Sequence, residues 1–263
     1  MSSEAPRLGV IETEGAGPPV VLLHGFGGCA AGWGKVQDRL GRAALAFDLP
    51  GHAASLDYPG FGSASFAAKT VVQEIDRCGV SEFHVAGHSM GGAVAALIAI
   101  GQPSRVLSAT LLAPGGMSSR INAPLLRAFA KAGTEEELEF CLMQMFAPGA
   151  AIPPNLLQFM AAQRSVPGQR EALGHIVERI LRGEGQGVIP ADALAALAMP
   201  VTVVWGAEDA VMPCDVLQSL PGHFHTLLLP GAGHMLLDEA PERAAAAIIE
   251  TIDRAAAQIL PPR

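Results

Sequence analysis

A strand, a tight turn and a helix follow one another directly between residues 83 and 99. The apolar run Phe83-His84-Val85-Ala86 leads into Gly87-His88-Ser89-Met90-Gly91, and small apolar residues follow. Glycines at both ends of a G-x-S-x-G pattern let the backbone turn sharply enough to hold the serine, in a strained conformation, above the strand end. The next helix then points its positive dipole end and free N–H groups at the serine hydroxyl. The pattern predicts a nucleophile elbow at Ser89.

A serine hydroxyl is a weak nucleophile, so it needs a base and a carboxylate that orients the base. Asp209 follows the predicted strand Val201–Trp205, and His234 follows the predicted strand 226–229. Parallel α/β sheets place their sites at such carboxyl ends, and Ser, Asp, His is the chain order that accompanies this elbow. We therefore predict a catalytic triad of Ser89, Asp209 and His234.

Two other carboxylates compete for the role of Asp209. Asp48 also lies at a strand end, but it precedes Ser89, and we expect it to fix its own turn through Asx-type hydrogen bonds. Glu208 adjoins Asp209, and the residues alone do not separate the two.

An oxyanion hole is predicted from a glycine-rich loop, His24-Gly25-Phe26-Gly27-Gly28, that follows the apolar run Val20–Leu23. Backbone N–H groups suit this task because they are in place before the charge forms. We assign the two donors to the N–H groups of Phe26 and Met90. His24 and His88 are interpreted as structural supports of the loop and the elbow.

An all-helical stretch interrupts the alternation of strands and helices. Strands are predicted near residues 20, 44, 83 and 107, with helices near 33–40, 64–78 and 90–101. Between Gly116 and Met199 there is no convincing strand, and helices are predicted near 122–131, 135–146, 154–164 and 169–183, the second starting at a capping box of Thr134 and Glu137. Alternation resumes at Val201 and ends in a helix from about 241 to 259. We predict an α/β core of residues 1–115 and 200–263 with a helical cap of residues 116–199.

The substrate is expected to lie between the cap and the predicted oxyanion loop. Flexible methionines suit an adaptable apolar pocket. The residues predicted to bind substrate are Gly25, Gly27, His88, Met143 and Phe146.

Composition limits the partners. The net charge of −8 and the pI near 5.4 argue against nucleic acid or an anionic membrane, and favour a small, neutral or apolar acyl substrate. The four cysteines form no C-x-x-C pair, and His223 and His225, which alternate on a probable strand, have no further ligands nearby, so neither metal nor cofactor is expected. Without an apolar leader or an 18-residue apolar span, we expect a cytoplasmic protein. We also expect a monomer or homodimer.

Five motifs in register make the chain resemble the α/β-hydrolase fold superfamily. They are His24-Gly25-Phe26-Gly27-Gly28, Asp48-Leu49-Pro50-Gly51-His52, Gly87-His88-Ser89-Met90-Gly91-Gly92, Trp205-Gly206-Ala207-Glu208-Asp209 and Gly231-Ala232-Gly233-His234. The cap, the stretch Leu112–Gly116 and Ile121-Asn122 are similar to the hydrolase-like C-terminal domain of the dihydrolipoamide acetyltransferase component of acetoin dehydrogenase complexes. Those proteins carry an N-terminal lipoyl domain, whereas this sequence starts directly at the hydrolase-like part.

The resemblance implies a mostly parallel sheet flanked by helices, with Ser89 as nucleophile, His234 as base and then acid, and Asp209 as its orienting carboxylate. A serine at position 89 separates the chain from relatives with aspartate there, such as epoxide hydrolases and haloalkane dehalogenases. We predict a cofactor-free serine hydrolase that cleaves a small ester, thioester or lactone through an acyl-enzyme. The alternatives are acyl transfer to a thiol or alcohol, carbon–carbon bond hydrolysis of a diketone, and a non-catalytic ligand-binding member of the fold.

Overall fold

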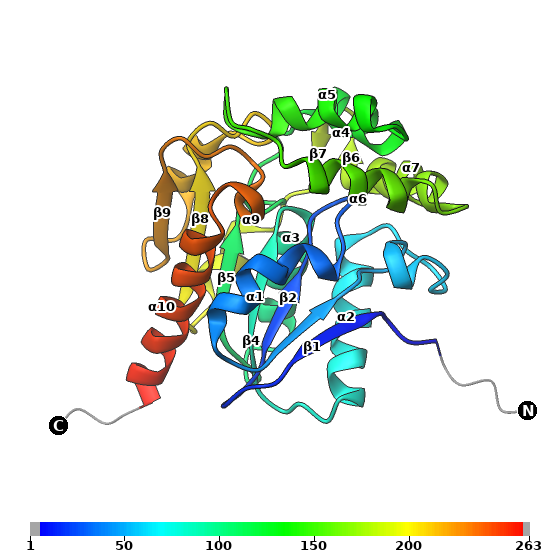
Figure 1. Cartoon of the computed structure of the whole chain (residues 1–263). Coiled ribbons are helices and arrows are strands. Elements are labelled where there is room, and N and C mark those ends of the chain that lie inside the picture. The colour runs from blue at the N-terminus through cyan, green and yellow to red at the C-terminus, as the bar shows by residue number, and fades with distance from the viewer. Residues whose placement is uncertain (1–5, 260–263) are drawn as a thin grey trace, which may run out of the picture.

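A seven-stranded, mostly parallel sheet forms the centre of the molecule (Figure 1). The computed structural model describes residues 6–259. The strand order is β1-β3-β2-β4-β5-β8-β9, and only β1 runs antiparallel to its neighbour. The strands are β1 (Val10–Thr13), β2 (Val20–Leu23), β3 (Ala44–Phe47), β4 (Phe83–His88), β5 (Val106–Leu112), β8 (Val201–Gly206) and β9 (His225–Leu229). Every residue of β2, β3, β4 and β8 is buried, as expected for parallel strands covered on both faces.

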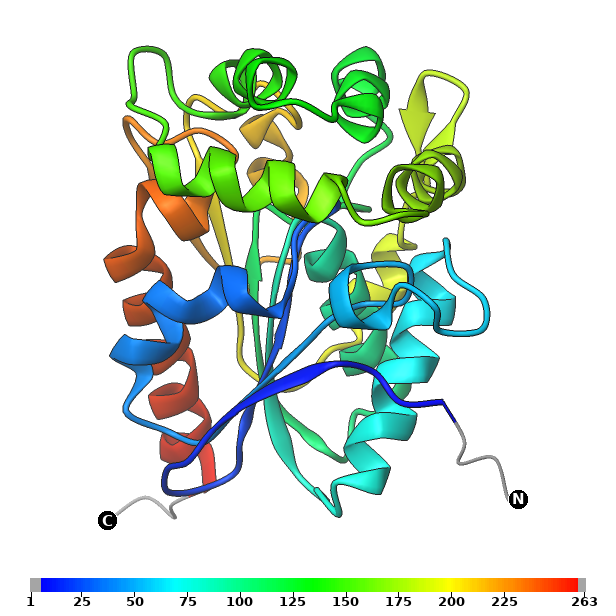
Figure 2. The same ribbon diagram turned by 45° about the vertical axis from the view of Figure 1, so that its right-hand side comes forward.

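Helices cover both faces of the sheet, which makes three layers (Figure 2). On one face α2 (Ala64–Arg77) packs beside α3 (Met90–Gly101), and on the other α1 (Gly34–Leu40) packs beside α10 (Pro241–Ile259). The predicted arrangement of a mostly parallel sheet between helices is confirmed. Of the helices within residues 6–259, none is both long and apolar enough to cross a lipid bilayer.

Four helices lie above the carboxyl edge of the sheet, and we call them the cap helices (Figure 1). They are α4 (Ala123–Lys131), α5 (Glu135–Met145), α6 (Pro154–Arg164) and α7 (Gln169–Ile180). At the start of α5 the Thr134 side chain accepts from the Glu137 N–H while the Glu137 carboxylate accepts from the Thr134 N–H, so the predicted capping box is present. The short helix α8 (Ala191–Ala195) leads back to the sheet.

Three short strands escape prediction. The predicted helix 169–183 ends at Ile180, because the chain turns at Gly183, where φ is +68°, and pairs β6 (Leu181–Arg182) with β7 (Gly185–Gln186). Strand β1 is a four-residue edge strand that is largely exposed, so it lacks the apolar run that identifies the inner strands. The remaining elements are the 3₁₀ helices η1 (Ala30–Trp33), η2 (Ala53–Ser55) and η3 (Cys214–Ser219), and the short helix α9 (Leu236–Glu239).

Candidate active site

The turn between β4 and α3 holds Ser89 in a strained conformation, with φ 53° and ψ −116°. A Cβ on Gly87 would lie 2.1 Å from the Gly91 carbonyl oxygen, and a Cβ on Gly91 would lie 2.2 Å from the Leu23 carbonyl oxygen. Both positions therefore require glycine. The Ser89 N–H donates to the Leu112 carbonyl at 2.9 Å, which ties the turn to the neighbouring strand β5.

Ser89, His234 and Asp209 form a continuous line of hydrogen bonds. The Ser89 hydroxyl donates to His234 Nε2 over 2.9 Å, and His234 Nδ1–H donates to Asp209 Oδ2 over 2.8 Å. An ionised carboxylate only accepts, so the ring proton lies on Nδ1 and Nε2 is free to accept a proton from the serine. The three residues follow β4, β8 and β9, whose carboxyl ends share one edge of the sheet.

Asp209 is fixed by the backbone as well as by His234. Its Oδ1 accepts from the N–H groups of Val211 and Met212 at 2.8 and 2.9 Å. Burial alone would raise the pKa of this carboxyl group, but His234 and the backbone N–H groups favour the charged form, and the net pKa lies below its usual range. The residue is therefore ionised at neutral pH.

The two competing carboxylates, Asp48 and Glu208, do not contact His234. Asp48 accepts from the N–H groups of Ala30, at 2.7 Å, and Ala54, at 3.2 Å. It therefore joins two loops instead of fixing only its own turn, which corrects the Asx-type expectation. Glu208, although adjacent in sequence, is not the residue that contacts His234.

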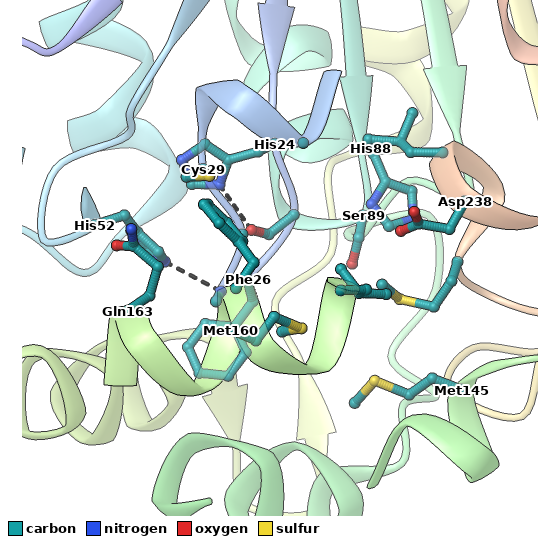
Figure 3. A pocket seen from close by; sticks show the side chains of 18 of the residues that line it. His24, Phe26, Cys29, His52, His88, Ser89, Met145, Met160, Gln163 and Asp238 are labelled. Carbon is teal, nitrogen blue, oxygen red and sulfur yellow. Dashed lines mark hydrogen bonds between the residues drawn. The ribbon is translucent and has the colours of Figure 1, made fainter. Parts of the chain in front are cut away.

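Two buried histidines hold the loop that follows β2 (Figure 3). His24 Nε2 accepts from the Leu49 N–H at 2.9 Å, so its Nδ1–H donates to the Gly25 carbonyl at 2.8 Å. His52 Nε2 accepts from the Gly27 N–H at 3.2 Å. Burial lowers the pKa of both imidazoles, so both rings are neutral and keep these acceptor nitrogens.

The same contacts leave the predicted oxyanion donors available. The next two N–H groups along the loop, those of Gly27 and Gly28, are bonded to His52 and to the Gly25 carbonyl, whereas the Phe26 N–H has no such bond among the described residues. Met90 is the first residue of α3, where an N–H has no acceptor within the helix. A Cβ on Gly25 would lie 3.2 Å from Ser89 Cβ, so the loop passes directly against the serine.

His52 escaped the sequence analysis as a functional residue. In the sequence it is the last residue of the motif that starts at Asp48, and the motif alone predicts no role for it. Its position just after β3, the strand beside β2, was the available signal, because loops that follow adjacent parallel strands meet at one edge.

A cavity of about 380 Å³ opens between Ser89 and the cap helices. Gly25, Gly27 and His88, for which substrate binding is predicted, line it. His88 also donates from Nε2–H to the His234 carbonyl at 2.7 Å, and burial lowers the pKa of its ring to about 3, so it supports the His234 loop as a neutral group. Cys29 lines the cavity as a buried thiol whose pKa is raised by burial.

Two predicted substrate contacts are wrong. Met143 lies on the outer face of α5 and is 65% exposed, whereas Phe146 is buried beside the Gly233 backbone and is not among the residues that line the cavity. Met145, from the inner face of α5, lines the cavity in their place. Helical periodicity identifies two faces but does not show which one the pocket meets.

His223 and His225, the two histidines considered for a metal site, have different surroundings. His223 lies before β9, and its Nε2–H donates to the Leu197 carbonyl at 3.0 Å, while His225 begins the strand and is exposed. Over residues 6–259 no three His, Cys, Asp or Glu side chains come together in a way that would hold a metal ion.

Comparison with known proteins identifies relatives of the chain. The model of the alpha/beta hydrolase family matches residues 20–247. The dihydrolipoyllysine-residue acetyltransferase component of the acetoin cleaving system of Pseudomonas putida is 35% identical over 230 residues, which are 86% of this chain and 61% of the relative. The chain thus spans about three fifths of the length of that curated relative.

Two further proteins resemble the chain. The 2-hydroxy-6-oxononadienedioate/2-hydroxy-6-oxononatrienedioate hydrolase of Burkholderia vietnamiensis is 28% identical over 211 residues, 75% of this chain and 73% of the relative. Among solved structures, the meta-cleavage product hydrolase from Pseudomonas fluorescens IP01 superimposes with a TM-score of 0.83 at 18% identity and covers 94% of both chains. At 18% identity, this structural similarity shows a shared fold and no more.

Proposed function

The chain belongs to the alpha/beta hydrolase family, and on that premise we propose that it is a serine hydrolase that cleaves a small ester or thioester through an acyl-enzyme on Ser89. The observation that carries the proposal is the unbroken line from Ser89 Oγ through His234 to the ionised Asp209. These residues supply a nucleophile, a base and an orienting carboxylate, so the reaction needs no cofactor.

In the first half-reaction Ser89 Oγ attacks the substrate carbonyl carbon as its proton passes to His234 Nε2. The negative charge that forms on the carbonyl oxygen is stabilised by the N–H groups of Phe26 and Met90. His234 then gives the proton to the leaving oxygen or sulfur, the carbon–leaving group bond breaks, and the acyl group stays on Ser89. Water repeats the sequence with His234 as base and releases the acid.

Transfer of the acyl group to a thiol is the second candidate. It is favoured by the 35% identity to a protein named as an acetyltransferase component. Both reactions share the acyl-enzyme, and they differ in whether water or a thiol removes the acyl group. The carbon–carbon bond hydrolysis considered from the sequence uses the same three residues, and its support is the 28% identical hydrolase of Burkholderia vietnamiensis.

The test is hydrolysis of p-nitrophenyl esters from acetyl to octanoyl by the wild type, Ser89→Ala and Ser165→Ala. Ser165 is an exposed serine at the end of α6, so it controls for loss of a hydroxyl group elsewhere. We expect a burst of p-nitrophenol in the wild type and in Ser165→Ala, and a loss of turnover of about 10⁴-fold or more in Ser89→Ala. Activity of Ser89→Ala within tenfold of the wild type would reject the acyl-enzyme.

Adding a thiol acceptor to the same reactions separates the two candidates. If a thiol removes the acyl group, the released acyl product is the new thioester and p-nitrophenol release accelerates with thiol concentration. If water removes it, the free acid remains the product at every thiol concentration.

A further inference from the structure

Arg164, the last residue of α6, is a buried cation that no acidic side chain of residues 6–259 pairs with. Its side chain is 3% exposed, and its Nε and Nη2 atoms have no hydrogen-bond acceptor. Within residues 6–259 it takes part in no salt bridge. Buried arginines are nearly always paired, because an unpaired desolvated charge is costly.

The surroundings of Arg164 do not neutralise it. The guanidinium lies over the Phe129 ring, 4.9 Å from its centre, which favours a cation but forms no hydrogen bond. Cys141 interacts with its charge, but burial raises the pKa of the Cys141 thiol, so the thiol is uncharged at neutral pH. Burial lowers the pKa of Arg164 only to about 10, so the side chain stays protonated.

Arg164 lines the same cavity as Ser89. A Cβ on Gly27 would lie 2.7 Å from Arg164 Nη2, so the charge sits against the loop that carries the Phe26 N–H. Figure 3 shows two other residues of α6, Met160 and Gln163, beside Phe26 and His52, which places this helix along the same wall.

The other charged side chains described along the cavity wall are paired. Lys35 and Asp238, which also line it, form an ion pair with each other at 2.9 Å. The histidines that line this wall, His24 and His52, are neutral. Among the described residues that line the cavity, Arg164 is therefore the charged side chain that lacks a counter-charge.

We propose that Arg164 binds a carboxylate of the substrate, and that the enzyme acts on the half-ester or half-thioester of a short dicarboxylic acid. Nε and Nη2 form one edge of the guanidinium fork, the edge that grips both oxygens of a carboxylate. One carboxylate also neutralises one arginine, whereas a phosphate dianion would leave negative charge in a largely apolar cavity. The substrate assignment rests on the proposed function, but the carboxylate site itself does not.

Binding is tested in the Ser89→Ala protein, where no turnover is needed. Calorimetry compares the monomethyl esters of succinic, adipic and suberic acid, each with one carboxylate, with the neutral dimethyl esters of the same acids. The comparison is repeated after adding Arg164→Met, which keeps an unbranched stem but removes the charged end, or Arg170→Met, which makes the same change at an exposed arginine of the neighbouring helix α7.

We expect at least one monomethyl ester to bind about 10- to 100-fold more tightly than its dimethyl ester, the range expected for hydrogen bonds to a charged group. Arg164→Met abolishes this preference, Arg164→Lys recovers only part of it because the fork is lost, and Arg170→Met leaves it unchanged. Equal binding of both ester series, no binding of any monomethyl ester, or a preference that survives Arg164→Met would overturn the proposal. Tighter binding of methyl phosphate than of every monomethyl ester would overturn the carboxylate assignment.

The unfolding temperature of Arg164→Met distinguishes a ligand-binding arginine from a structural one. Without ligand, Arg164→Met is expected to unfold at the same or a higher temperature than its parent, because it removes an uncompensated buried charge. The monomethyl esters should raise the unfolding temperature of Ser89→Ala but not of the double variant. A fall of more than about 10 °C in Arg164→Met would indicate a structural role and reject the proposal. If these results hold while the p-nitrophenyl esters are not turned over, the proposed reaction fails and the carboxylate site remains.

Discussion

Asp209→Asn tests how the carboxylate controls the proton on His234. The two carboxylate oxygens of Asp209 have different partners. Oδ1 accepts hydrogen bonds from two backbone N–H groups, and Oδ2 accepts one from His234 Nδ1–H. Asparagine has one oxygen and one NH₂ group for these two places. If the NH₂ faced the backbone, two buried N–H donors would lose their acceptor, at about 1–3 kcal/mol each. The oxygen therefore stays with the backbone, and the NH₂ turns toward His234.

An NH₂ group facing Nδ1 reverses the histidine tautomer. Nδ1 must then accept, the ring proton moves to Nε2, and the nitrogen that faces Ser89 can no longer take up the serine proton. We expect kcat/KM for the best p-nitrophenyl ester to fall by about 10⁴-fold at pH 7, the loss that accompanies a wrong tautomer in such triads. The low-field proton NMR signal of the His234–Asp209 hydrogen bond should also disappear.

Glu208→Gln is the matched control, because it changes the adjacent carboxylate in the same way. It should leave kcat/KM unchanged, and both variants should unfold near the wild-type temperature. The reasoning would be refuted if Asp209→Asn kept more than about a tenth of the wild-type activity. It would be refuted equally if Glu208→Gln showed the larger loss.

Three other predictions follow from individual contacts. His52→Leu leaves the Gly27 N–H without its acceptor and should lower kcat up to about 100-fold with little change in KM, whereas His52→Gln, which supplies an acceptor oxygen, should recover most of it in the ester assay. Gly91→Ala would place a Cβ 2.2 Å from a backbone carbonyl and should destabilise the fold by more than about 3 kcal/mol in urea unfolding. Its control in the same helix, Gly101→Ala, meets nothing within 4 Å and should stabilise the protein by about 0.5–1 kcal/mol; similar results for the two would refute the steric argument. Burial lowers the pKa of His84 to about 4, so between about pH 6.5 and 4 the unfolded chain binds a proton that the folded protein rejects. As the pH falls through this range, His84 alone adds up to about 1.4 kcal/mol per pH unit to the loss in free energy of unfolding, so the wild type should lose more than His84→Asn, and equal slopes in the two proteins would contradict this.

The strands and the meeting of Ser89, His234 and Asp209 could be predicted because their signals are local. Inner parallel strands are continuous apolar runs, and β2, β4 and β8 carry functional motifs at their carboxyl ends. Parallel pairing brings those ends to one edge whatever the length of the chain between them. The order of the motifs along the chain was therefore enough to place Ser89 beside His234.

The cavity wall could not be predicted because it depends on how whole helices are rotated. The apolar residues of α5 indicate an inner face, yet Met143 points outward and Met145 inward, a difference of two positions. A helix pattern contains no information about the element that it meets. His52 was missed for a related reason, since its partner Gly27 belongs to another loop, 25 residues earlier in the chain.

The expectation of a neutral or apolar substrate rests on a charge count, which describes the surface of the protein and not its cavity. The net charge of −8 describes mostly exposed side chains, whose fields are screened by salt over about 8–10 Å. Arg164 ends a stretch of small and polar residues that resembles an ordinary exposed helix end, and only the packing of the cap helices buries it. In an apolar cavity an unpaired cation acts with little screening, so under the proposal it outweighs the acidic residues outside in selecting the ligand. If monomethyl esters bind through Arg164, lowering the salt concentration should change their affinity far less than it would for a surface ion pair, because the site is shielded from the solution.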